Sequence, residues 1–211
     1  MVITEIKKQR NHLFAIVFDD NSEALIDKKT VIDSGLFIGQ TLGKNELASL
    51  LEESDYQRAF SRAIWYIEQG DISKKALKLK LLRAKFTEKS TEKAISRLLE
   101  LSLLDDARLA ERLAEKLLSS NISKRAALSK MAAKGIEFSL AKDVLEQSVC
   151  SPEAQIRAVI DKKYKNKLSS PEGVRKVFAA LQRLGFGYSD IRAVLKAYSE
   201  ELEFSEENYG L

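Results

Sequence analysis

The sequence has few of the residues that interrupt helices and few of those that perform chemistry. Its 211 residues include two prolines, nine glycines, one cysteine and one histidine. Scarce proline and glycine, beside many Leu, Ala, Lys and Glu residues, indicate a mainly α-helical protein. Because Cys150 stands alone, the sequence has no intrachain disulfide framework, and we interpret this residue as a small apolar filler. The lone histidine, His12, excludes a histidine-rich metal site and most catalytic triads.

Long apolar runs and nucleotide-binding motifs are also missing. No apolar stretch approaches the roughly 20 residues of a membrane span, and residues 1–5 lack the pattern of a signal peptide. The sequence contains no Walker-type phosphate loop. We interpret the paired carboxylates Asp105 and Asp106 as helix-capping groups rather than as catalytic acids. We therefore expect a cytoplasmic protein that is not an enzyme and that uses no cofactor and no metal.

Charge is distributed unevenly along the chain. Residues 54–199 hold 29 Lys and Arg against 17 Asp and Glu, a net charge of +12, whereas residues 1–53 carry −3 and residues 200–211 carry −5. A basic body between acidic ends favours a polyanionic partner. A well-solvated helical surface rich in lysine is the alternative explanation.

The N-terminal part predicts a small β-meander. Three short segments combine β-branched and aromatic content with alternation, and polar turn formers separate them. These segments are residues 2–7, 13–18 and 23–26. Asp27 is expected to cap a short helix that ends near Gly35. Asn45 is expected to cap a separate helix that runs through Leu51.

One apolar pattern recurs at an interval of 50 residues and organises the rest of the chain. Positions such as Leu81, Met131 and Leu181 fall into register without a gap. Each copy predicts three helices, and a unit this small buries its faces well only by stacking on a neighbour, so we expect an elongated array. The predicted helices are residues 56–69, 74–84 and 90–101, then 107–118, 124–134 and 140–147, and finally 153–165, 172–184 and 190–197.

The second helix of each copy has a marked start and, in two copies, a marked end. The serines expected to act as N-caps are Ser73, Ser123 and Ser170. Gly135 and Gly185 supply the left-handed residue that closes a helix. The first copy has Lys85 at this position. Either Lys85 adopts the left-handed conformation at a cost of about 1 to 2 kcal/mol, or this turn has another geometry.

Basic side chains crowd these second helices and form the predicted partner-binding or DNA-binding surface. A cation gains nothing from the macrodipole at a helix N-terminus, so its recurrence there indicates a ligand, and such termini bind phosphate. Ordinary surface lysines remain the alternative. The predicted residues are Lys74, Lys75, Lys78, Lys124, Arg125, Lys130, Arg175, Lys176 and Arg183. Aromatic residues, among them Trp65 and Phe86, are interpreted as core rather than as a stacking platform for bases.

The repeated segments resemble the RecX regulatory proteins of bacterial recombination. The resemblance covers about residues 50–199. Two positions depart from the family pattern, because Ala76 replaces an acid and Lys85 replaces the turn glycine. The segments that carry the resemblance are ISKKALKLKLLRAKFTEKSTEKAISRLLELSLLDDARLAERLAEKLL, AALSKMAAKGI and KVFAALQRLGFGYSDIRAVL.

The resemblance implies a non-enzymatic regulator of RecA, most simply an inhibitor. Such a protein lies in the groove of the RecA filament on single-stranded DNA and restrains ATP hydrolysis and strand exchange during DNA repair. RecA and single-stranded DNA are then the partners, and we expect a monomer with no membrane contact. The basic body leaves open a stand-alone, sequence-nonspecific nucleic-acid-binding protein built from helix-turn-helix-like units.

The expected fold class is mainly α, with three tandem three-helix repeats in an elongated array after a small β-meander. The expected division is an N-terminal extension at residues 1–53, repeats at 54–104, 105–150 and 151–200, and an acidic tail at 201–211.

Overall fold

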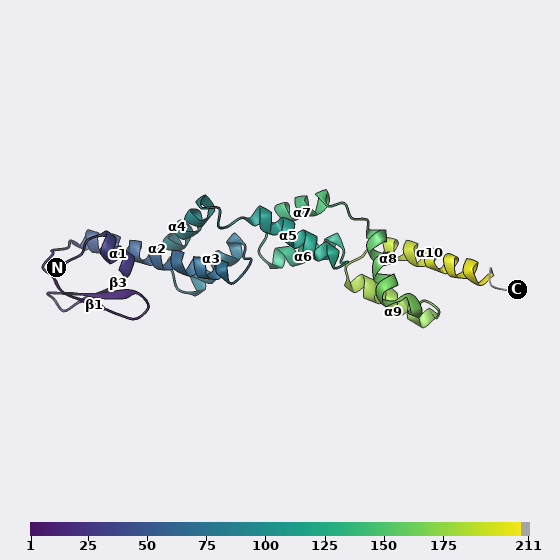
Figure 1. The fold of residues 1–211 in the computed structure, drawn as a ribbon, viewed down its shortest axis with the longest axis horizontal. Coiled ribbons are helices and arrows are strands. Elements are labelled where there is room, and N and C mark those ends of the chain that lie inside the picture. Colours follow the sequence, from purple (N-terminus) through teal and green to yellow (C-terminus); the bar gives the residue numbers. More distant parts are fainter. Residues whose placement is uncertain (208–211) are drawn as a thin grey trace. The chain divides into compact units, whose positions relative to one another are not determined.

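The computed structural model describes the backbone of residues 1–207 and the side chains of residues 1–198. The chain divides into two compact units, Met1–Asp105 and Asp106–Leu211. The first unit holds a three-stranded antiparallel sheet and four helices, and the second unit is helical (Figure 1). The predicted fold class, mainly α with three-helix repeats after a small sheet, is confirmed.

The sheet is a meander of β1 (Ile3–Lys8), β2 (Leu13–Phe18) and β3 (Glu23–Asp27), in that order. All three strands lie where the sequence predicts them. The register between β1 and β2 shifts between Ile3 and Glu5. Residues three apart on a regular strand point to opposite faces, and this irregularity allows Ile3 and Ile6 to pack into the same core.

A short helix, α1 (Lys28–Asp33), follows the sheet directly. Its N-cap is Asp27, whose carboxylate accepts hydrogen bonds from the backbone N–H groups of Lys29 and Thr30 at 2.5 and 3.2 Å. Gly35 has φ 59°, the left-handed conformation expected just after a helix. The predicted cap and stop of this helix are therefore confirmed.

The next helix, α2 (Lys44–Glu68), corrects two predictions. Its N-cap is Gly43 rather than Asn45, and the Glu46 carboxylate accepts a hydrogen bond from the Gly43 N–H at 3.3 Å. The expected junction near residues 52–55 is absent, because α2 continues through it. No glycine or proline lies within the helix, so nothing in the local sequence stops it.

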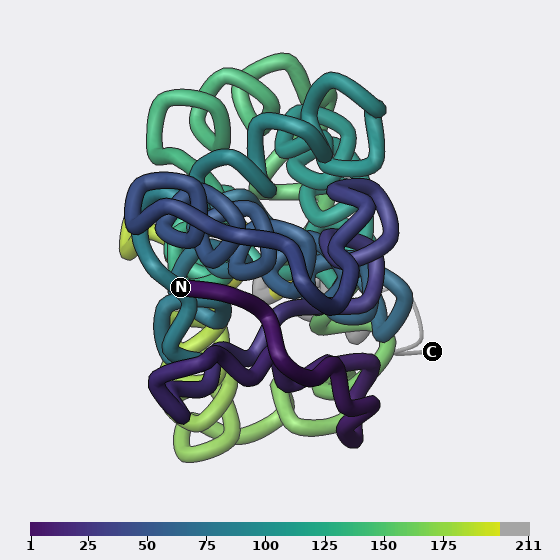
Figure 2. The backbone as a smooth tube through the Cα atoms, turned by 90° about the vertical axis from the view of Figure 1, so that its left-hand side faces the viewer, coloured from purple at the N-terminus to yellow at the C-terminus, as the bar shows by residue number. Residues whose placement is uncertain are grey.

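Helix α2 serves two cores of the first unit. Leu47 and Leu50 in its N-terminal half pack against the core of the sheet. Phe60 and Ile64 in its C-terminal half pack against α3 (Lys74–Arg83) and α4 (Glu88–Glu100), which complete repeat 1. In Figure 2 the trace can be followed from the purple strands into this blue helical part of the chain.

The second unit contains repeats 2 and 3. Repeat 2 consists of three helices, α5 (Asp106–Ser119), α6 (Lys124–Ala133) and α7 (Phe138–Gln147). Repeat 3 consists of α8 (Pro152–Lys163), the 3-10 turn η1 (Lys165–Lys167), α9 (Pro171–Arg183) and α10 (Tyr188–Glu207).

Apolar residues 50 positions apart occupy equivalent places in the cores of the three repeats. Leu81, Met131 and Leu181 are each fully buried, with 0% of their surface exposed. The next equivalent set, one helical turn earlier, is equally buried and comprises Leu77, Ala127 and Val177. The three repeats therefore use the same helix faces for their cores.

All three second helices end in the same way, which decides the open question about Lys85. Its φ is 68°, beside 85° for Gly135 and 89° for Gly185. The N–H of each turn residue donates to the carbonyl three positions before it, for example Lys85 to Leu82 at 3.0 Å. The following N–H donates to the carbonyl five positions before it, for example Phe86 to Leu81 at 3.3 Å. Lys85 thus adopts a conformation that favours glycine.

The third helices begin about two residues earlier than predicted. Helices α4, α7 and α10 start at Glu88, Phe138 and Tyr188, two positions after the apolar residue that closes the preceding turn. At α4 the reason is local, because the Thr87 hydroxyl caps the helix by accepting from the Ser90 N–H at 3.2 Å. Helix α10 continues to Glu207, past the predicted start of the acidic tail. The side chains of that tail lie outside the described residues.

Candidate partner-binding surface

The nine predicted binding residues lie on α3, α6 and α9, and one position stands out. Lys75, Arg125 and Arg175 occupy the same place in the three repeats, and all three are exposed. Among the residues whose side chains the structure describes, no carboxylate forms an ion pair with any of them. Lys130 is likewise exposed and forms no ion pair with a described side chain. Lys74 is also exposed, but it already interacts with another group of the protein.

Lys78 differs from the neighbouring basic residues because it forms ion pairs within the protein. Its ammonium group forms ion pairs with Glu92 at 2.8 Å and with Glu88 at 3.2 Å, which join α3 to the start of α4. Hydrogen bonds to Glu92 and then to Glu88 raise the pKa of Lys78 above its ordinary value. Lys78 is therefore a weaker candidate for partner contact than Lys75.

Three further predicted residues also have partners. The Lys124 ammonium donates to the Ser148 carbonyl oxygen at 2.7 Å, at the end of α7. Lys176 forms an ion pair with Glu172 at 2.7 Å, one turn earlier on α9. Arg183 donates through Nε to the carbonyl of its own helix at 3.3 Å. These contacts reduce the set of cations available for a partner without removing the repeated position.

Helix α9 also begins earlier in its repeat than α3 and α6 do. Ser170 caps it by accepting from the Gly173 N–H at 3.1 Å, so Pro171 and Glu172 occupy the first turn. Arg175 consequently lies in the second turn, whereas Lys75 and Arg125 lie in the first. The place in the repeat, rather than the helix N-terminus, is what the three exposed cations share.

Repeats 2 and 3 are joined through buried polar contacts that fix α6 relative to the end of α9. The Gln155 amide donates to the carbonyls of Leu118 and Ile122 at 3.2 and 3.1 Å. The Ser123 N–H donates to the Leu184 carbonyl at 3.0 Å. A Cβ added to Gly185 would lie 2.4 Å from the Ser123 hydroxyl oxygen. Arg125 and Arg175 are therefore carried by repeats that pack directly on each other.

A second cationic feature, in the first unit, was not predicted. A cleft of about 710 Å³ is lined by Lys28, Lys29, Arg58, Arg62 and Trp65, among other residues. Trp65 is 46% exposed, so its assignment to the core was wrong. The sequence signal was present, because Arg58, Arg62 and Trp65 are spaced by one helical turn and fall on one face of α2.

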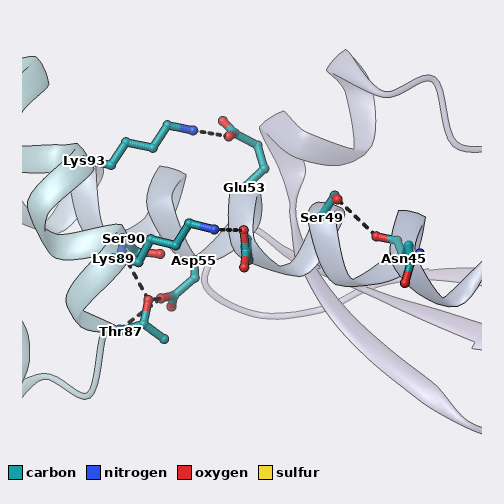
Figure 3. Close-up of polar contacts among 9 residues, drawn as sticks. Asn45, Ser49, Glu53, Asp55, Thr87, Lys89, Ser90 and Lys93 are labelled. Atoms are coloured by element: carbon teal, nitrogen blue, oxygen red, sulfur yellow. Dashed lines mark hydrogen bonds and ion pairs between the residues drawn. The ribbon is translucent and has the colours of Figure 1, made fainter.

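Polar contacts join α2 to α4, the helix that follows the cleft-lining residue Phe86 (Figure 3). The Asp55 carboxylate accepts from the N–H and the hydroxyl of Thr87 at 3.1 and 2.7 Å, next to the cleft-lining Phe86. Glu53 forms an ion pair with Lys93 at 2.6 Å. Partial burial opposes ionisation of Glu53, but hydrogen bonds from Lys93 and Gln57 outweigh it and hold its pKa below the ordinary value of 4.5.

The described residues contain no group of three or more His, Cys, Asp or Glu side chains placed to hold a metal ion. None of the helices, over the part of the chain that was searched, combines the length and apolar character needed to cross a membrane. Asp106 is the first residue of α5 and Asp105 immediately precedes it, the positions expected of groups that favour a helix start.

Comparison with known proteins points to one family. The family model described as the third three-helix domain of RecX matches residues 152–195. The "Regulatory protein RecX" of Clostridium acetobutylicum is 26% identical over 214 residues, covering 97% of this chain and 96% of that protein. The protein of the same name from Streptococcus mutans is 25% identical over 213 residues, covering 99% of this chain and 80% of that protein.

This chain is similar to the RecX regulatory proteins over nearly its whole length. Solved structures agree on the fold. A crystal structure of regulatory protein RecX matches with a TM-score of 0.66 at 20% identity, covering 92% of this chain and 98% of the other. RecX from Lactobacillus salivarius matches with a TM-score of 0.60 at 19% identity, covering 69% of this chain and 97% of the other. The RecX relatives are named regulatory proteins.

Proposed function

We propose that this protein is a member of the RecX family and that it regulates the RecA recombinase in the cytoplasm as a monomeric inhibitor. It binds along the groove of the RecA filament on single-stranded DNA and slows ATP hydrolysis and strand exchange during homologous recombination and the SOS response. The names of the relatives support a regulatory role. The observation that carries the proposal is the exposed basic residue at the same position of each repeat, namely Lys75, Arg125 and Arg175.

A repeated weak contact suits a repetitive partner. One exposed ion pair contributes only about 0.2 to 1 kcal/mol. Three such contacts on one chain reinforce one another, because the first contact raises the effective concentration of the next. The excess positive charge of residues 54–199 also attracts the polyanionic filament at low ionic strength. We retain the division into three repeat domains and an N-terminal extension as part of this proposal.

The test is charge reversal at the shared position, in the triple variant K75E/R125E/R175E. These side chains are exposed, so helicity should persist while inhibition of RecA ATPase and strand exchange weakens by about tenfold or more. That factor corresponds to roughly 0.5 kcal/mol for each of three lost contacts. Both activities would be measured over a range of concentrations of the purified protein.

A matched control has the same change in charge at exposed positions on three other helices, one of which lies in the first unit and two in the second. Lys44, Lys116 and Lys162 are exposed on α2, α5 and α8, and K44E/K116E/K162E should retain most of the inhibition. Equal losses in both variants would show that net charge alone matters. Unchanged RecA activity with saturating wild-type protein would disprove the proposed function itself.

The second candidate function is sequence-nonspecific nucleic-acid binding without RecA, which the net charge of +12 on residues 54–199 favours. Co-sedimentation separates the two functions. An inhibitor specific for the filament should bind much more tightly to RecA on single-stranded DNA than to either component alone. A stand-alone binder should associate with bare DNA as tightly as with the filament, with a log-log salt slope of about −0.7 per phosphate contact.

A further inference from the structure

The unpredicted cleft lies entirely within the first unit and is built by segments far apart in sequence. The β1–β2 hairpin tip, α1, the middle of α2 and the turn before α4 each contribute to its wall. The backbone N–H of Lys28 donates to the carbonyl of His12 at 2.8 Å, which ties the hairpin tip to α1. Asn11 and His12 both have φ 59°, a conformation that non-glycine residues adopt at a cost.

The cleft is positively charged, and its cations form no ion pairs with the described side chains. Lys28, Lys29, Arg58 and Arg62 line it, and no carboxylate of the described side chains lies in ion-pair contact with any of them. Of the two lining carboxylates, Asp27 is engaged as the cap of α1 and only Asp33 is exposed. Glu53 is close enough to Lys29 to be influenced by it, but its ion pair is with Lys93.

Two guanidinium groups of the cleft lie within cation–π distance of its aromatic rings. The Arg62 guanidinium carbon lies 5.4 Å from the centre of the Trp65 ring, and that of Arg58 lies 5.7 Å from the centre of the Phe86 ring. An indole that is 46% exposed leaves a large apolar surface in contact with water. Covering this surface with a flat, aromatic ligand group would stabilise a complex.

We propose that this cleft binds a short stretch of single-stranded nucleic acid. Phosphate groups contact Lys28, Lys29 and Arg58, and a base stacks beside Trp65 and the plane of the Arg62 guanidinium. A volume of about 710 Å³ lies within the range of roughly 300 to 1,000 Å³ that ligand-sized groups occupy. Only an unpaired base has a free face to stack, which favours a single strand over a duplex. This proposal is independent of RecA.

An acidic peptide is the main competing ligand, because it would satisfy the same cations. It would gain little from an exposed indole flanked by a guanidinium, whereas alternating aromatic and cationic groups are typical of surfaces that bind single strands. The two ligands can be separated by experiment.

The chain provides its own probe, because Trp65 is the only tryptophan in the sequence. Titrating the full-length protein with an oligo(dT) strand, in the absence of RecA, should quench the tryptophan emission as a base stacks on the indole. The same titration with a duplex of equal length, or with a poly-glutamate peptide of equal charge, should give little change. No quenching by the single strand, or equal binding of the peptide, would overturn the proposal.

Variants distinguish the cleft from the repeat surface. W65A and R58Q/R62Q should each weaken oligo(dT) binding by about tenfold, measured by anisotropy of a labelled strand. K75E/R125E/R175E should retain the quenching, since its changes lie outside the cleft. If the triple variant loses oligo(dT) binding, measured by anisotropy, while R58Q/R62Q retains it, the strand lies on the repeats and the cleft is not its site. Should W65A not fold, the quenching and R58Q/R62Q still decide the matter.

Discussion

Replacing Lys85 with glycine should stabilise the first unit. Lys85 is exposed and closes α3 with φ 68°, while the equivalent residues of the other repeats are glycines with φ 85° and 89°. An L-residue in this conformation costs about 1 to 2 kcal/mol. Glycine removes that cost but gives the unfolded chain more freedom, which offsets about 0.4 to 1 kcal/mol. The net gain should be about 0.5 to 1 kcal/mol.

The assay is thermal and urea unfolding followed by far-ultraviolet circular dichroism. For a unit of the size of Met1–Asp105, the expected gain raises the midpoint of its transition by about 2 to 5 °C. K85A is the matched control, because alanine keeps the unfavourable backbone while removing the long side chain, and it should remain within about 0.5 kcal/mol of the wild type. If K85G unfolds at or below the midpoint of K85A, backbone conformation is not what limits this turn.

Two further predictions concern the other turn and the contacts of α2. G185A should destabilise the second unit by about 2 to 4 kcal/mol, because φ is +89° and the new Cβ would lie 2.4 Å from the Ser123 hydroxyl oxygen and 2.7 Å from the Ala126 Cβ. G35A is its control, since Gly35 has φ +59° but nothing within 4 Å of an added Cβ. Equal losses of unfolding free energy in the two variants would show that the steric contacts of the new Cβ at position 185 do not contribute. E53Q should lower the stability of the first unit at neutral pH by a few tenths of a kcal/mol, because the glutamate is 40% exposed and solvent screens its ion pair. Folding lowers the pKa of Glu53, so the stabilisation from its ionised carboxylate is complete above pH 4.5 and is lost as the pH falls through the folded-state pKa. The unfolding curves of E53Q and wild type should therefore converge in acid. Curves that diverged there would contradict the reasoning.

Local chemistry explains why much of the fold could be predicted. Ser73, Ser123 and Ser170 cap their helices as expected, because a cap needs only a short polar side chain and the backbone N–H three residues later. The shared core positions could be predicted for a similar reason, since the spacing of apolar residues sets the buried face of a helix before any tertiary contact forms.

Two predictions for α2 were wrong, because the length of the helix and the burial of one of its side chains depend on more than the local apolar pattern. The break expected within α2 rested on the start of the repeat pattern at residue 54, but a helix stops only where its own residues or contacts stop it. Trp65 occupies an apolar position of the helical pattern and was assigned to the core. The structure leaves it 46% exposed, because the face of α2 that carries it borders a cleft.

The candidate partner surface was only partly specified by the sequence. The recurrence of a cation at Lys75, Arg125 and Arg175 is visible in the sequence alone. Whether a given cation is available depends on the carboxylates that folding brings to it. Lys78 meets Glu92 across two helices, whereas no described carboxylate pairs with Lys75.

The sequence by itself determined the number of repeats, the serine caps of their second helices and the shared core positions, because these depend on side-chain spacing and on hydrogen bonds over a few residues. Only the tertiary structure decided that Lys28, Arg62 and Trp65 line one cleft. The physical reason is that a cleft is formed by the packing of a hairpin, a short helix and a long helix, and the distances among their side chains are not encoded in any one segment.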